Sequence, residues 1–138
     1  MVYIIGAGPG DPELITVKGQ RLLKEADVII YAGSLVNPAL LDYAKADCEI
    51  YNSASMTLGE VIETITAAEQ EGKMTVRLHT GDPAIYGAIQ EQMDELSRRN
   101  IEYTVIPGVS SFLATAAALK QEYTLPEISQ TVIITRNE

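Results

Sequence analysis

The sequence has little of several residue types on which common enzyme chemistries depend. It contains one cysteine, Cys48, and one histidine, His79, and it has no tryptophan. One cysteine cannot form an internal disulfide, and one histidine with one cysteine cannot complete a zinc or iron–sulfur ligand set. The sequence therefore predicts no metal site, and we interpret Cys48 as a small core residue. No Gly-x-Ser-x-Gly segment is present to supply a hydrolase nucleophile.

Long apolar runs and basic clusters are also scarce. No run approaches the roughly 18 apolar residues that span a bilayer. The segment Met1-Val2-Tyr3 leads directly into a predicted strand, without the charged and apolar regions of a signal peptide. Ten basic against nineteen acidic residues give a net charge of −9, which argues against a nucleic-acid surface. We expect a soluble, cytoplasmic protein that binds neither nucleic acid nor membranes.

Apolar strand-like segments alternate with helix-like segments along the 138 residues, which is enough chain for one domain. The predicted strands are Val2–Ile5, Val28–Tyr31, Glu49–Tyr51, Thr75–Leu78, Tyr103–Ile106 and Thr131–Thr135. Five helices are predicted. The first follows the glycine loop Gly6–Pro12, the next three begin at Pro38, at the capping box Thr57–Glu60 and at about Ile85, and the last runs from about Phe112 to Leu119. This pattern predicts an α/β fold, a mostly parallel sheet with helices on both faces.

Two similar loops follow predicted strands, Gly6–Pro12 and Gly81–Gly87. Both should lie at the carboxyl edge of the sheet, where α/β proteins bind ligands. The first loop does not fit the dinucleotide fingerprint, because the sixth position counted from Gly6 is Asp11 and because Pro9 lacks a backbone N–H. The loops suit a cofactor that carries a cation and an amino-acid group without phosphates, such as S-adenosylmethionine. The alternative interpretation is that the glycines only form tight turns.

Other residues near these loops allow two interpretations. His79 could touch a ligand or form a structural hydrogen bond. Ser110 and Ser111 could cap a helix or contact the same ligand as the loops. Tyr86 could belong to the core or to the wall of a cofactor site.

With these residues placed, the chain resembles the tetrapyrrole (corrin/porphyrin) methylase family over essentially its whole length. The segments that carry the resemblance are Gly6–Thr16, Ala26–Tyr31, Arg77–Pro83 and Pro107–Ser111. The resemblance implies a two-domain, homodimeric S-adenosylmethionine-dependent methyltransferase, of which residues 1–138 form the amino-terminal domain. The chain ends directly after its last predicted strand, which also predicts that more chain follows.

The resemblance implies specific site residues. The family's cofactor contacts fall here on Pro9, Thr80, Gly81, Asp82, Ile85, Ser110 and Ser111. The tetrapyrrole substrate would lie in a trough between the first loop and the segment Tyr31–Val36. The uroporphyrinogen branch of the family has an acid–base aspartate where this chain has Ala32, so no catalytic residue is assigned. Contacts to substrate carboxylates would come from Arg77, from Arg136 or from the second domain.

Three segments resemble, more narrowly, the branch that methylates carbon 11 of precorrin-4 or its cobalt form in cobalamin biosynthesis. They are Tyr31–Val36, Leu78–Pro83 and Ser129–Arg136. Alternatives within the fold are another corrin carbon, uroporphyrinogen III, diphthine or ribosomal RNA as acceptor. The alternative from another class is a non-catalytic nucleotide-binding module.

Overall fold

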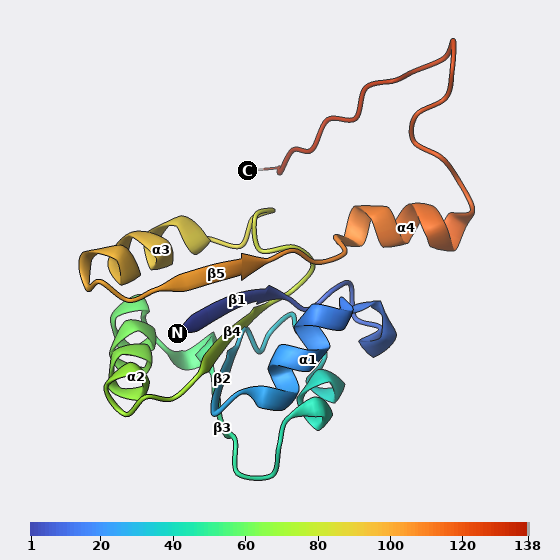
Figure 1. The fold of residues 1–138 in the computed structure, drawn as a ribbon. Helices are drawn as coiled ribbons and strands as arrows, with labels where there is room; N and C mark the ends of the chain where they lie inside the picture. The colour runs from blue at the N-terminus through green and yellow to red at the C-terminus, as the bar shows by residue number, and fades with distance from the viewer. Residues whose placement is uncertain (138) are drawn as a thin grey trace.

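The computed structural model describes residues 1–137, and it shows one parallel sheet wrapped by helices (Figure 1). The strands are β1 (Val2–Gly6), β2 (Val28–Tyr31), β3 (Glu49–Asn52), β4 (Thr75–His79) and β5 (Tyr103–Ile106). The α-helices are α1 (Val17–Glu25), α2 (Leu58–Gln70), α3 (Ile89–Arg98) and α4 (Ser111–Leu119). Short 3₁₀ turns cover Pro12–Leu14 (η1), Pro38–Tyr43 (η2) and Ser53–Ser55 (η3).

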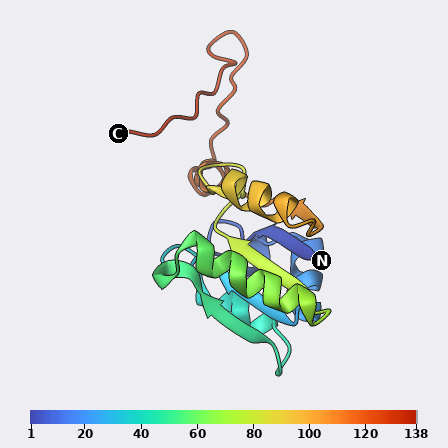
Figure 2. The same ribbon diagram turned by 90° about the vertical axis from the view of Figure 1, so that its left-hand side faces the viewer.

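The strand order is β3-β2-β4-β1-β5, and every pairing is parallel. The helix α1 and the turn η2 pack on one face of the sheet, while α2 and α3 pack on the other (Figure 1, Figure 2). The predicted α/β class with helices on both faces is confirmed. No helix within residues 1–137 is long and apolar enough to cross a membrane.

Side-chain alternation along the strands builds a separate core on each face. Val2 and Ile4 of β1 join the cluster under α2 and α3, whereas Ile5 joins the cluster under α1. In β2 the alternation repeats, because Ile29 faces α1 and its neighbour Ile30 faces α2. Each fully buried aliphatic side chain contributes about 1.5–3 kcal/mol relative to an exposed one. Because the strands are buried on both faces of the sheet, their sequences are continuous apolar runs.

The predicted capping box at the start of α2 is present. The Thr57 hydroxyl accepts a hydrogen bond from the Glu60 N–H at 3.2 Å, and the Glu60 carboxylate accepts one from the Thr57 N–H at 2.7 Å. Two backbone donors that a helix start leaves unpaired are therefore satisfied by local sequence alone.

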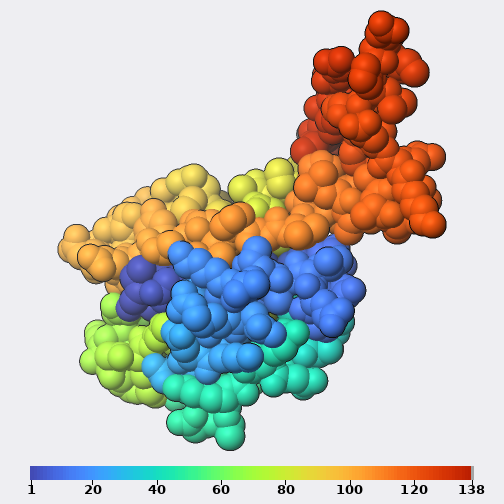
Figure 3. Space-filling view, turned by 45° about the vertical axis from the view of Figure 1, so that its right-hand side comes forward, coloured from blue at the N-terminus to red at the C-terminus, as the bar shows by residue number. Residues whose placement is uncertain are grey.

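The prediction of a sixth strand at Thr131–Thr135 is wrong. Within residues 1–137 this segment is not part of a sheet, and Ile133 is 80% exposed. Figure 3 shows the tail standing away from the body of the domain beyond α4. A strand needs a neighbouring strand for its backbone hydrogen bonds, and α4 carries the tail away from the sheet before this segment begins.

The third helix also begins later than predicted. The sequence favoured a helical start at Ile85, but α3 begins at Ile89 and Ile85 is exposed in a loop. Ala88 has a left-handed φ of 50° and Tyr86 a φ of 54°, so the intervening chain cannot be helical. Residues 82–88 therefore form a loop, and not the first turn of α3.

The strand β4 buries polar side chains on the face that α3 covers. Arg77 is 6% exposed, and it donates from Nε to Gln92 Oε1 at 3.1 Å and from Nη1 to the carbonyl of Ile30 at 3.2 Å. His79 is 6% exposed, and its Nε2 has no partner among the described residues. Burial, reinforced by the charge of Arg77, lowers the pKa of His79 to about 4. The structural hydrogen bond that the sequence allowed for His79 is therefore absent at Nε2 among the described residues.

We expect the buried neutral state of His79 to make stability depend on pH. The unfolded imidazole has a pKa near 6.5, so between pH 6.5 and about 4 the unfolded chain binds a proton that the folded chain excludes. The free energy of unfolding should therefore fall with decreasing pH through this window, by up to about 3 kcal/mol. Urea denaturation of wild type and His79→Gln at several pH values measures the effect. Carboxylate titration affects both proteins alike, so an equal pH slope in the two would contradict the expectation.

Candidate functional site

Three loops meet at the carboxyl edge of the sheet. They follow three strands that are adjacent in the sheet. We call residues 7–11, after β1, the first loop, residues 80–88, after β4, the second loop, and residues 107–110, after β5, the third loop. Because the strands are parallel neighbours, all three loops share one rim. The sequence predicted this rim for both glycine loops, and the structure confirms it.

Backbone hydrogen bonds join the first and second loops. Gly8 donates to the carbonyl of Gly81 at 3.2 Å, and Gly81 donates to the carbonyl of Gly8 at 2.8 Å. Below this pair, Ala7 donates to the carbonyl of His79 at 2.6 Å. Beyond the parallel β1–β4 ladder, Gly8 and Gly81 thus form an isolated antiparallel bridge, which fixes the relative positions of the loops without side chains.

Three glycines form a junction in which the loops touch backbone to backbone. A Cβ added to Gly6 would lie 2.5 Å from the oxygen of Gly81 and 2.7 Å from the Cα of Gly108. A Cβ added to Gly108 would lie 2.2 Å from the same oxygen of Gly81. All three distances are far shorter than a van der Waals contact, so no other residue type fits at Gly6 or at Gly108. These glycines therefore have a packing role, and they keep the rim free of side chains.

The carboxylate of Asp82 fastens the second loop to the third. Its Oδ1 accepts from the Ala84 N–H at 2.8 Å, and its Oδ2 accepts from the Gly108 N–H at 2.9 Å. Each oxygen has a second lone pair, so the carboxylate can still accept a hydrogen bond from a ligand. Asp82 is therefore both a structural link and an available acceptor at the rim.

All seven predicted cofactor residues lie on these loops or at the start of α4. Pro9 and Thr80 are half-buried, Ile85 is exposed, and Ser110 is buried against the second loop at the N-cap of α4. The Ser110 side chain forms no capping hydrogen bond, contrary to the simple capping interpretation. Ser111 is exposed in the first turn of α4. The structure thus brings together Pro9, Thr80, Gly81, Asp82, Ile85, Ser110 and Ser111.

Asn37 is a rim residue that the sequence reasoning missed. Its Nδ2 donates to the carbonyl of Gly10 at 2.7 Å, and its Oδ1 accepts from the Ala39 N–H at 3.0 Å. The Tyr43 hydroxyl also donates to the carbonyl of Pro12, at 3.3 Å. These two bonds hold the first loop, and Pro12 directly after it, against the segment that follows β2. This is the side on which the substrate trough was predicted. The dipeptide Asn37-Pro38 is a turn signal that could have indicated the cap.

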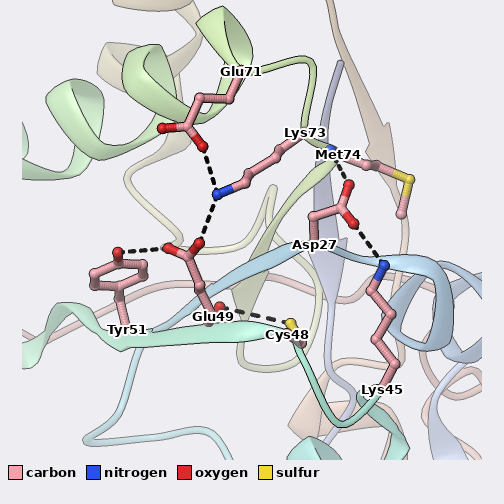
Figure 4. Close-up of polar contacts among 8 residues, drawn as sticks. All are labelled: Asp27, Lys45, Cys48, Glu49, Tyr51, Glu71, Lys73 and Met74. Carbon is pink, nitrogen blue, oxygen red and sulfur yellow. Dashed lines mark hydrogen bonds and ion pairs between the residues drawn. The ribbon is translucent and has the colours of Figure 1, made fainter.

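The main cluster of charged residues lies at the opposite edge of the sheet (Figure 4). Asp27 binds the Lys45 ammonium at 2.6 Å and accepts from the Met74 N–H at 2.8 Å, and the bond from Lys45 lowers the pKa of Asp27. Lys73 lies 2.7 Å from Glu49 and 2.6 Å from Glu71. These ion pairs join the amino ends of β2, β3 and β4. Their lysines are thus unavailable to an anionic ligand at the rim.

Residues 1–137 contain no group of three or more His, Cys, Asp and Glu side chains placed to hold a metal ion. The rim instead offers backbone groups, the carboxylates of Asp11 and Asp82, and serine hydroxyls. Such a set can bind and orient a polar organic ligand by hydrogen bonds.

Comparison with known proteins places this geometry in a family. The sequence profile of the Tetrapyrrole (Corrin/Porphyrin) Methylases matches residues 1–138. The Cobalt-precorrin-4 C(11)-methyltransferase of Methanocaldococcus jannaschii is 65% identical over 99% of this chain, which covers 53% of that protein. The chain therefore spans about half the length of the curated relatives it matches.

Solved structures agree with the sequence comparison. The crystal structure of a cobalt precorrin-4 methyltransferase, a cobalamin biosynthetic enzyme, superposes with a TM-score of 0.97 at 53% identity, covering 99% of this chain and 57% of that one. The uroporphyrin-III C-methyl transferase of Thermus thermophilus complexed with S-adenyl homocysteine gives a TM-score of 0.72 at 38% identity, covering 83% of this chain and 47% of that one. The family profile, the sequence relative and the solved structure all indicate the same family. The chain belongs to the tetrapyrrole (corrin/porphyrin) methylases.

Proposed function

We propose that the protein containing this chain transfers a methyl group from S-adenosylmethionine to carbon 11 of precorrin-4 or cobalt-precorrin-4. The observation that carries the proposal is the 65% identity, over 99% of this chain, to a relative named for that reaction. The solved relative with a TM-score of 0.97 is named for the same substrate. The product then belongs to cobalamin biosynthesis.

The rim fits the proposed cofactor. Asp82 retains acceptor capacity toward a cationic amino group. The Ser110 hydroxyl, which does not cap α4, can bond to a ligand. The negative charge of Asp11 and the missing N–H of Pro9 suit a ligand without phosphates. A neighbour at 38% identity was crystallised with S-adenyl homocysteine, which supports the same assignment.

The cofactor, when bound, supplies a methyl group on a sulfonium that the acceptor carbon attacks directly. The chain then needs no nucleophile of its own, and with Ala32 in place of the acid–base aspartate no catalytic residue is assigned. The role of the loops is to hold cofactor and acceptor in line and to exclude water. The bonds from Asn37 to Gly10 and from Tyr43 to Pro12 stiffen the proposed tetrapyrrole trough, which is bordered by the first loop and residues 31–36.

The proposal includes a second domain and a partner subunit. This chain covers 53% of the relative that is 65% identical, so the assembled enzyme would contain roughly as much chain again. We propose that residues 1–138 are the amino-terminal domain of a cytoplasmic homodimer whose second domain closes the cofactor cleft. Residues 131–135, exposed here, would then have a neighbour to pair with.

The activity itself is directly testable. We expect the full-length protein, incubated with labelled S-adenosylmethionine and a mixture of corrin intermediates, to place the label on carbon 11 of precorrin-4. Mapping the labelled carbon by NMR gives the answer. Label on uroporphyrinogen III or on another corrin carbon would assign the protein to a different branch of the family. Ligand-induced thermal shifts with S-adenosylhomocysteine, NAD and ATP separately test the non-catalytic nucleotide-binding alternative.

Asp82→Ala should weaken S-adenosylhomocysteine binding by about 1–3 kcal/mol, because the Gly108 N–H loses its partner and the second and third loops separate. Asp82→Asn should also weaken it, because its amide offers one acceptor oxygen to two N–H donors. Glu60→Ala is the matched control, since the Glu60 carboxylate also accepts a local backbone N–H, that of Thr57 at 2.7 Å, but belongs to none of the three loops. Titration calorimetry measures the affinities. Wild-type affinity in Asp82→Ala would remove Asp82 from the site.

The domain in isolation should fold yet bind the cofactor weakly. Residues 1–138 contain a core on each face of the sheet, so a cooperative thermal transition is expected. The rim forms only one wall of the proposed cleft, and the loss of about 3–4 kcal/mol of facing contacts weakens binding by two to three orders of magnitude. Parallel calorimetric titrations of the domain and the full-length protein compare the two. Equal affinities would show that this domain holds the whole cofactor site.

A further inference from the structure

The domain has few cations that could meet an anionic substrate. Of its ten Lys and Arg residues, five are engaged by carboxylates. These five are Arg21, Lys45, Lys73, Arg98 and Arg99. Arg77, one of the two arginines that the sequence left as candidates, is buried under α3 by its bonds to Gln92 and Ile30. Its guanidinium therefore cannot reach a ligand at the rim.

Arg136 is the candidate that the structure places against a rim loop. Its guanidinium carbon lies 6.0 Å from the ring centroid of Tyr86 in the second loop. The chain reaches this point because the tail beyond α4 turns back toward the loops (Figure 1). Lys24 makes a similar contact, 6.0 Å from the ring of Tyr43, but it lies in the last turn of α1.

The second loop holds the Tyr86 ring outward in a strained conformation. Tyr86 has a φ of 54° and is 58% exposed, and Ala88 is also left-handed with a φ of 50°. Gly87 is enclosed, since a Cβ there would lie 2.1 Å from the carbonyl oxygen of Pro83. A bulky residue with positive φ costs on the order of 1–3 kcal/mol, and such strain is concentrated at functional sites. Core packing does not explain an exposed ring held in this way.

We propose that Arg136, whose guanidinium lies over the ring of Tyr86, binds a carboxylate of the tetrapyrrole substrate and so selects acceptors that carry acidic side chains. This inference rests on the proposed function for its substrate class. A guanidinium that lies over an aromatic face keeps its edge N–H groups free, and these match a carboxylate in a bidentate pair. The need for a local cation follows from the net charge of −9, which opposes the approach of a polycarboxylate.

Steady-state kinetics of the full-length enzyme test the assignment. Arg136→Ala should raise the KM for precorrin-4 by about tenfold to a hundredfold, the usual effect of losing a charged hydrogen bond. Its affinity for S-adenosylhomocysteine should stay within about twofold of wild type, because that ligand is assigned to other residues. Arg136→Lys should lie between the two, and Tyr86→Leu, which removes the aromatic ring under the guanidinium, should raise KM as well. The matched control is Lys24→Ala, which removes the other stacked cation and should leave KM unchanged.

Binding of uroporphyrin, followed by fluorescence, gives a second readout that needs no turnover. Wild-type binding should weaken with added salt, and Arg136→Ala should bind more weakly with a smaller salt dependence. An unchanged KM in Arg136→Ala, an equal effect in Lys24→Ala, or a loss confined to cofactor affinity would overturn the proposal. If wild type does not methylate precorrin-4 but Arg136→Ala still loses uroporphyrin binding, the proposed function fails while the carboxylate site stands.

Discussion

The arrangement of the rim depends on the contact between three glycine backbones. Gly6 ends β1, while Gly81 and Gly108 lie in the loops after β4 and β5, and the three approach closely enough that a single methyl group would force them apart. With no side chains at the junction, the loops pack directly on one another and present peptide groups to a ligand. The same contact brings the N–H of Gly108 within reach of Asp82. The geometry of this rim is therefore a consequence of backbone packing more than of any one side chain.

Charge is distributed unevenly between the two edges of the sheet. At the amino edge, Asp27, Lys45, Glu49, Lys73 and Glu71 form ion pairs that join successive strands (Figure 4). Solvent screens these pairs, so their main effect is to orient the strand ends. The carboxyl edge uses the Asp82 carboxylate for a loop-to-loop bond, and Arg136 of the tail lies over the ring of Tyr86 in the second loop.

Local signals in the sequence predicted most elements because their causes are local. The capping box at Thr57 satisfies backbone donors within one turn, and the apolar runs of the strands reflect burial on both faces. The start of α3 and the strand at residues 131–135 were predicted wrongly for the opposite reason. Ile85 has helical spacing, but the enclosed Gly87 and the left-handed Tyr86 impose a loop. Residues 131–135 have strong β propensity, but that propensity is realised only beside another strand.

The sequence by itself determined the α/β class, the family and the positions of the two glycine loops, because strand burial and glycine spacing are written along the chain. It also grouped the seven cofactor candidates, whose roles remain proposals. Only the tertiary structure decided that His79 and Arg77 are buried under α3, that Asp82 links two loops, and that Asn37 holds the first loop. It likewise separated Arg136 from Arg77 as the cation near the rim. The physical reason is that the contacts of Asp82, Asn37 and Arg136 join residues 26 to 50 positions apart, and that the burial of Arg77 and His79 depends on which face of β4 carries them. Such relations exist only once the sheet has formed.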